Sequence, residues 1–269
     1  MLINGQTGIS ISADDRGLMY GDGVFRTIRV AGGKLLHWHL HYQKLQHDCS
    51  ALNIVCPSKQ LLSSELDQMI RNEADAIAKV IITRGESTRG YAPSSNSGVT
   101  RILTIHAAPQ YPDSYALSGI PVHICRLRLG HQPLLAGIKH LNRLENVLAA
   151  AEWNSADFAE GILLDQAGNL VEGTRSNLFL VKNGDLSTPE LTRCGVAGVQ
   201  RDRVMDWARQ SGVVCHVKDL SLEDMLSSDE AFLVNSVIGL WPIREMAAYK
   251  RNSFPISLLI QNGLKHGAD

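Results

Sequence analysis

The sequence predicts an α+β protein with two lobes, and three observations lead to this fold class. Helical and strand patterns are mixed along the chain. The 269 residues are enough for one large domain or two small ones. Residues 109–119 have the composition of a loop. We therefore expect a smaller N-terminal lobe (1–110), a linker (111–119) and a larger C-terminal lobe (120–269).

The N-terminal lobe combines three predicted strands with two predicted helices. Strands are expected at 24–30, 78–83 and 101–107, and the Gly, Ser and Pro-rich stretch 85–98 is expected to be a long loop. Residues 39–52 carry apolar side chains at three- and four-residue spacing, which predicts an amphipathic helix. Pro57 ends this pattern, and a second helix is expected at 59–73.

The C-terminal lobe follows the same mixed pattern. Strands are expected at 121–127, 161–165, 177–181, 213–217 and 231–234. Helices are expected at 142–153, with Asn142 as N-cap and Glu145 three residues later, and from Gly198 to about residue 210. Asn183-Gly184 predicts a tight turn.

Composition excludes several classes of function. The net charge is −1, with 26 basic and 27 acidic residues, so no excess of positive charge points to nucleic acid or anionic lipid. The five cysteines are widely spaced without a C-x-x-C pair, which favours reduced thiols in the cytoplasm. We read no signal peptide and no membrane-spanning run, and expect a cytoplasmic protein.

Lys139 is the first candidate for chemistry. It ends an apolar run and precedes a predicted helix, and partial burial would lower its pKa and make a nucleophilic amine. The alternative is a strand-end lysine whose stem covers apolar surface while its ammonium group reaches water, which the segment alone favours.

Two further segments have a chemical and a structural interpretation. Gly198 precedes a helix whose free amides would bind an anion, or it is chosen for turn geometry alone. Glu172 would pair with a partner such as a pyridinium nitrogen if buried, or it faces solvent from its strand. The segment from Tyr20 to Phe25 lacks the spacing of a dinucleotide loop. His37, His39 and His41 do not share one helix face, so no metal site is expected.

Taken together and in this order, these segments resemble the branched-chain aminotransferase-like family of pyridoxal-phosphate enzymes (fold type IV). The resemblance runs from Asp15 to Ser236, and its most specific part is the segment from His131 to Glu145. It implies a homodimer with pyridoxal 5'-phosphate between two α+β lobes. Lys139 matches the family's Schiff-base lysine and Glu172 the acid at the pyridine nitrogen. The phosphate is expected at Gly198, Val199, Asn235 and Ser236, and also at Lys44, where the family usually has arginine.

The resemblance is greatest to the lyase members, which convert 4-amino-4-deoxychorismate to 4-aminobenzoate and pyruvate for folate synthesis. The alternative is an aminotransferase for D-amino or branched-chain amino acids, although transaminases of the family often carry an acid where this chain has Arg26. A binding protein that keeps the fold is disfavoured because lysine, glutamate and glycine all match. The substrate carries two carboxylates. Candidates to bind them are Arg84, Arg89, Tyr91 and Arg101.

Overall fold

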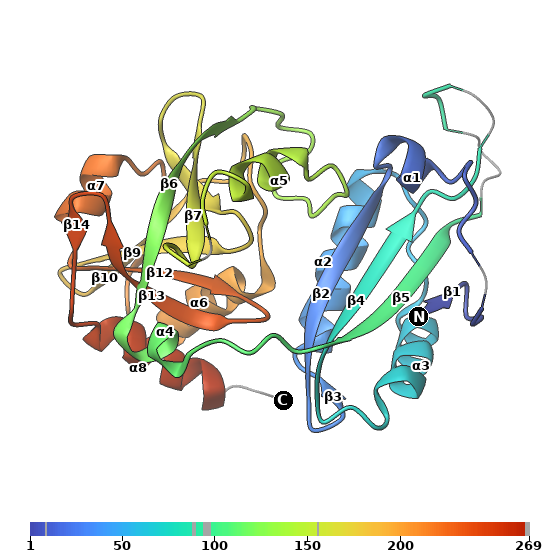
Figure 1. The fold of residues 1–269 in the computed structure, drawn as a ribbon, viewed down its shortest axis with the longest axis horizontal. Helices are drawn as coiled ribbons and strands as arrows, with labels where there is room; N and C mark the ends of the chain where they lie inside the picture. Colours follow the sequence, from blue (N-terminus) through green and yellow to red (C-terminus); the bar gives the residue numbers. More distant parts are fainter. Residues whose placement is uncertain (9, 88–89, 94–97, 155, 267–269) are drawn as a thin grey trace. The chain divides into compact units, whose positions relative to one another are not determined.

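The computed structural model describes residues 1–8, 10–87, 90–93, 98–154 and 156–266, and the chain divides into two compact units. Unit 1 consists of Met1–Pro109 and Ile138–Asn142, and unit 2 of Gln110–Gly137 and the chain from Arg143 onward. The short segment that carries Lys139 thus belongs to unit 1, although it follows residue 120 in the sequence. Both units contain helices and sheet, which confirms the predicted α+β fold (Figure 1).

Unit 1 is built on one antiparallel sheet of five strands in the order β1-β5-β4-β2-β3. The predicted strands and helices of this lobe are present, with ends shifted by a few residues. Its elements are β1 (Leu2–Ile3), α1 (Arg16–Tyr20), β2 (Gly23–Ala31), β3 (Lys34–Leu35), α2 (Trp38–Ala51), α3 (Lys59–Ile70), β4 (Asp75–Thr83) and β5 (Thr100–Ala107).

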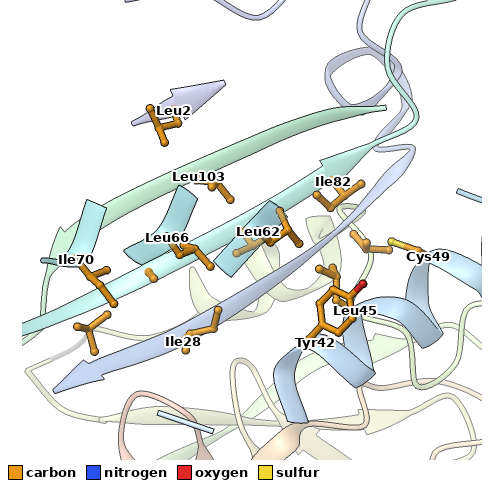
Figure 2. Close-up of a cluster of buried hydrophobic side chains, with 14 of the residues drawn as sticks. Leu2, Ile28, Tyr42, Leu45, Cys49, Leu62, Leu66, Ile70, Ile82 and Leu103 are labelled. Atoms are coloured by element: carbon orange, nitrogen blue, oxygen red, sulfur yellow. The ribbon is translucent and has the colours of Figure 1, made fainter. Parts of the chain in front are cut away.

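The core of unit 1 lies between this sheet and helices α2 and α3 (Figure 2). Strand β2 alternates in burial, as its period of two requires, so Ile28 and Val30 face the helices. Arg26 lies on the same buried face, with only 2% of its surface exposed. A guanidinium in this position needs an internal partner.

Unit 2 contains a larger sheet in the order β11-β10-β9-β12-β13-β6-β7-β8. Strand β8 also pairs with β9, so the six strands from β9 to β8 form a closed ring. The elements are α4 (Asp113–Ser118), β6 (Ile120–Leu129), α5 (Leu144–Ala150), β7 (Glu160–Asp165), β8 (Leu170–Gly173), β9 (Asn177–Lys182), β10 (Asp185–Pro189), α6 (Val199–Gln210), β11 (Cys215–Lys218), α7 (Leu222–Ser227), β12 (Glu230–Asn235), β13 (Gly239–Met246), β14 (Tyr249–Lys250) and α8 (Pro255–His266).

Both faces of the central strands are buried. In β9, Leu178 and Leu180 belong to one apolar cluster, with Trp241 of β13. Phe179 and Val181 belong to another cluster, which includes Val204 of α6 and Ile260 of α8. Burial on both faces explains why these strands appear in the sequence as continuous apolar runs.

The prediction for helix α5 was wrong at both ends. The helix covers seven residues, and its N-cap is Arg143 without a side-chain cap. The Asn142 side chain donates instead to the Gly21 carbonyl at 3.2 Å. Glu145 accepts from the Gly130 N–H at 2.8 Å, so the expected reciprocal cap does not form. Residues 111–119, expected as a linker, contain the short helix α4.

Among the described residues, no helix is both long and apolar enough to cross a bilayer. The same residues contain no cluster of three or more His, Cys, Asp or Glu side chains suited to a metal ion.

Candidate active site

In unit 2, residues 194–198 form a loop that two side chains hold by its backbone, and we call it the clamped loop. Glu172 of β8 and Asn177 of β9 are cross-strand partners where the ring of strands closes. Glu172 Oε2 accepts from the Val196 N–H at 2.8 Å, and Asn177 Nδ2 donates to the Val196 carbonyl at 2.7 Å. Glu172 is 4% exposed, so its carboxylate is buried. The chemical interpretation of Glu172 requires this burial, whereas the alternative has the side chain facing solvent.

Two glycines allow the clamped loop to lie close to these strands. Gly195 has φ +85°, and a Cβ there would come within 2.7 Å of Val171 and 2.8 Å of Leu191. At Gly198 a Cβ would lie 2.4 Å from Asn177 Oδ1. That oxygen accepts from the Gly198 N–H at 3.1 Å. Neither position has room for a side chain in this conformation.

Helix α6 begins directly after the clamped loop, with Gly198 as its N-cap. The N–H groups of the first helical turn have no carbonyl partner inside the helix, and the helix dipole adds positive potential there. Arg201, in the same turn, donates to Thr188 Oγ1 at 3.3 Å and to the Pro189 carbonyl at 3.2 Å. Burial lowers the pKa of its guanidinium. The Gly198 N–H already donates to Asn177 Oδ1, so the backbone from Val199 onward forms the part of this turn that is suited to an anion.

The end of strand β12 lies next to the start of β9, because Val234 pairs with Asn177. Asn235 Nδ2 donates to the Arg175 carbonyl at 3.0 Å, and Asn235 Oδ1 accepts from the N–H groups of Val237 and Ile238. The Asn235 side chain thus builds the turn after β12, and the half-buried Ser236 lies in that turn.

Gly137 extends the clamped loop by one short parallel bridge to Val196. The Gly137 N–H donates to the Gly195 carbonyl at 2.9 Å, and its carbonyl accepts from the Ala197 N–H at 3.1 Å. Gly137 has φ +78° and stands two residues before Lys139 in the sequence.

Lys139 itself is described within unit 1. Its carbonyl accepts from the Phe25 N–H at 3.0 Å, and its N–H donates to Asp48 Oδ2 at 3.1 Å. The Lys139 Nζ lies 4.6 Å from the centre of the Phe25 ring. The side chain is half-buried. The lysine thus starts from a fixed backbone and places its amine over an aromatic face.

Sequence reasoning missed Lys79, whose Nζ lies 4.9 Å from the centre of the same Phe25 ring. Lys79 is half-buried in the middle of β4, opposite Thr27 of β2. The available signal was a lone lysine inside an apolar strand. The position of Lys79 beside the Phe25 ring could not be inferred without knowing that β2 pairs with β4.

The Arg84 side chain forms hydrogen bonds with other residues of unit 1. Its Nε and Nη2 donate to the carboxylate of Asp22 at 2.8 and 3.0 Å, and its other contacts are the carbonyls of Asn53 and Leu52. Arg16 binds Asp22 as well, at 2.8 Å. Burial opposes ionisation of Asp22, but hydrogen bonds from Arg84 and Arg16 outweigh it, and the pKa of Asp22 lies below its usual value.

The other candidates for substrate binding differ in their surroundings. Arg101 forms a two-pronged pair with Glu65 of α3, with contacts from 2.6 to 3.0 Å. Tyr91 is 84% exposed, and its ring centre lies 5.3 Å from that of Tyr20. Arg89 lies outside the described residues. The half-buried Lys44 lies in α2 and accepts at its carbonyl from Arg26 at 3.2 Å.

The predicted site residues therefore fall in both units. Glu172, Gly198, Val199, Asn235 and Ser236 belong to unit 2, where hydrogen bonds and strand pairing join most of them around the clamped loop. Lys139 and Lys44 belong to unit 1, where Asp48 and Arg26 contact their backbones.

Known proteins resemble the chain over most of its length. An aminodeoxychorismate lyase of Vibrio harveyi is 35% identical over 259 residues, which cover 96% of this chain and 95% of the relative. A protein of Methanocaldococcus jannaschii named for branched-chain-amino-acid aminotransferase activity is 31% identical, with 88% and 82% covered. The crystal structure of 4-amino-4-deoxychorismate lyase from Pseudomonas aeruginosa has a TM-score of 0.94 and 41% identity, with 99% and 98% covered.

The family pattern described as amino-transferase class IV matches residues 23–246, which include β2 with Phe25, Lys139, the clamped loop and all of β13. A match over this span and relatives above 30% identity agree with the geometry of the site. The chain belongs to the class IV aminotransferase family.

Proposed function

We propose that this protein is a pyridoxal-phosphate-dependent lyase that converts 4-amino-4-deoxychorismate to 4-aminobenzoate, a folate precursor, and pyruvate. Two relatives named for this activity, from Vibrio and Pseudomonas, are 35% and 41% identical over nearly the whole chain. The structural observation that carries the proposal is the buried carboxylate of Glu172 tied to the loop that opens α6. Unit 2 thus contains both a buried acid, which could pair with the ring nitrogen, and a helix start that is suited to the phosphate.

The residues of the clamped loop fit pyridoxal phosphate. The phosphate would take the amides at the start of α6 from Val199 onward, next to Gly198, whose own N–H donates to Asn177 Oδ1. Asn235 and Ser236 would lie beside it, and Lys44 would add positive charge. Glu172 would hold the pyridine nitrogen in its protonated form, and Lys139 would provide the amine that binds the cofactor covalently. When bound, the cofactor supplies an electron sink for carbanion chemistry.

In this reaction Lys139 has three tasks. It anchors the cofactor between turnovers, and as a free amine it removes the proton from C4 of the substrate. It then returns a proton to the departing three-carbon group, which leaves as pyruvate while the ring becomes aromatic. An amine that accepts and returns a proton needs a pKa near the working pH. The Glu172 carboxylate would stabilise the positive charge at the ring nitrogen.

The two substrate carboxylates need cations, and we propose Lys79 for one of them. Its ammonium group flanks Phe25, as that of Lys139 does. The guanidinium groups of Arg84 and Arg101 already donate hydrogen bonds to Asp22 and Glu65, so we rank these arginines below Lys79 as partners of a substrate carboxylate. Tyr91, which is exposed, and Arg89 remain candidates from the sequence.

We further propose a homodimer in the cytoplasm. Helix α5 exposes Leu144, Val147 and Leu148 by 75%, 60% and 61%, at the spacing of one helix face. An apolar stripe of this kind favours a second copy as its partner. All five cysteines are free, in keeping with a reducing compartment.

The competing function is an aminotransferase for D-amino or branched-chain amino acids. An aminotransferase needs a second substrate to collect the nitrogen, whereas the lyase releases the nitrogen with its product. The purified holoenzyme should form 4-aminobenzoate and pyruvate in equal amounts over many turnovers without a keto acid. Product formation that stops after one turnover until a keto acid is added would establish the aminotransferase instead. Borohydride reduction and peptide mapping should place the cofactor on Lys139, and cofactor on another lysine would refute that assignment.

A further inference from the structure

Asp48 is a fully buried acid in helix α2, beside Leu45 and Cys49 of the apolar core. A charge in such surroundings requires close partners. Its carboxylate forms an ion pair with Arg26 of β2, which is also almost fully buried. His47 Nδ1 lies 3.3 Å from the other carboxylate oxygen.

The third partner of Asp48 is the backbone of Lys139. Lys139 and Leu141 pair with β2 through the bonds Phe25 N–H to Lys139 carbonyl and Leu141 N–H to Gly23 carbonyl, at 3.0 and 2.9 Å. In a regular antiparallel ladder the Lys139 N–H would point to the carbonyl of Phe25. It donates instead to Asp48 Oδ2 at 3.1 Å, the same oxygen that Arg26 contacts.

We propose that Arg26 and Asp48 are positioning residues that fix the main chain of Lys139. This inference rests on the proposed role of Lys139 as the cofactor lysine. In that role the side chain alternates between a covalently bound and a free amine. With N–H and carbonyl both held, the change is confined to the side-chain torsions, and the amine returns to one place.

The ionic character of the pair supports a positioning role. A buried ion pair contributes little to stability compared with well-packed apolar side chains of similar volume. A hydrogen bond from an N–H group to a charged carboxylate is, however, stronger and shorter than one to a neutral acceptor. Arg26 pairs with the Asp48 carboxylate and also donates to the Lys44 carbonyl, so two contacts fix the position of the acceptor oxygen relative to α2.

The test compares the double variant Arg26→Met/Asp48→Leu with Asp48→Asn, both as holoenzyme. The double variant removes both charges together and should melt within a few degrees of the wild type. Its kcat should fall about 10-fold or more with KM within about 2-fold, as expected for a misplaced reactive group. Its visible circular dichroism band per bound cofactor should change. Asp48→Asn keeps an oxygen acceptor for the Lys139 N–H but leaves the buried Arg26 without its counter-charge. Its melting temperature should therefore fall, while its kcat, measured well below that temperature, should stay within about 3-fold of the wild type.

A control separates positioning from general destabilisation. Glu230→Gln replaces a buried carboxylate that accepts from the N–H groups of Ile256 and Ser257 at the start of α8. This variant should lower the melting temperature without changing the dichroism band. Wild-type kcat and dichroism in the double variant would overturn the proposal, as would equal loss in Asp48→Asn. Failure of the wild type to form 4-aminobenzoate refutes the lyase function alone, because the dichroism test requires only cofactor bound to Lys139.

Discussion

At the scale of single residues, Glu172 has a structural and a proposed chemical task that substitution can separate. In Glu172→Gln, a side-chain oxygen can still accept from the Val196 N–H, so the clamped loop should survive. The variant lacks the negative charge that would keep the ring nitrogen protonated. We expect kcat to fall about 100-fold, the scale of losing one electrostatic contact in an active site. Steady-state kinetics on cofactor-saturated enzyme measure this, and an unchanged kcat would remove Glu172 from the reaction.

Single residues also show what the sequence can reveal about the site. Lys139 and Glu172 were selected because whole segments around them match a family. Taken alone, each had a structural interpretation that was at least as favoured. The arginine candidates were chosen by their charge and their place in or beside the loop at 85–98. Their partners are distant in sequence, as with Arg84 and Asp22 or Arg101 and Glu65. Which acid contacts which arginine depends on how strands pair and how helices pack on the sheet, which composition does not record.

At the scale of elements, the start of α6 provides a test of the phosphate site. Gly198→Ala would place a Cβ 2.4 Å from Asn177 Oδ1 and push the clamped loop away from β9. We expect cofactor affinity to fall at least about 10-fold, because the loop leads directly into the amides of α6 that are proposed to bind the phosphate. Gly130→Ala is the matched control, since its Cβ would meet Glu145 Oε1 at an ordinary 3.5 Å. Fluorescence titration of the apoprotein with cofactor compares the two. Equal affinities would mean that the phosphate binds elsewhere.

Elements with a clear period were predicted, and elements set by distant contacts were not. Helices α2 and α6 and strand β2 follow from their apolar spacing, and β9 follows from a continuous apolar run. Helix α5 is shorter than its pattern because Asn142 is drawn to Gly21 and Glu145 to Gly130. Strand β13 was missed because Pro242 lies within it and removes one ladder donor.

At the scale of the whole molecule, the exposed stripe on α5 bears on assembly. Changing Leu144, Val147 and Leu148 to lysine removes the apolar contact and adds like charges that repel across a two-fold interface. We expect the sedimentation coefficient to shift from dimer to monomer at micromolar concentration. Leu259→Lys on α8 is the control, because Leu259 is similarly exposed at 55%. A triple variant that sediments like the wild type would place the interface elsewhere.

The bonds that hold the clamped loop have a consequence for how the cofactor is acquired. Glu172 and Asn177 fix Val196 with protein atoms alone, and Gly137 adds two further bonds. The proposed phosphate site therefore stays ordered in the apoprotein, and little conformational entropy would be lost when the cofactor binds there. Such a site favours rapid capture from a dilute cofactor pool. It also means that exchange of old cofactor for new does not require this part of the protein to unfold.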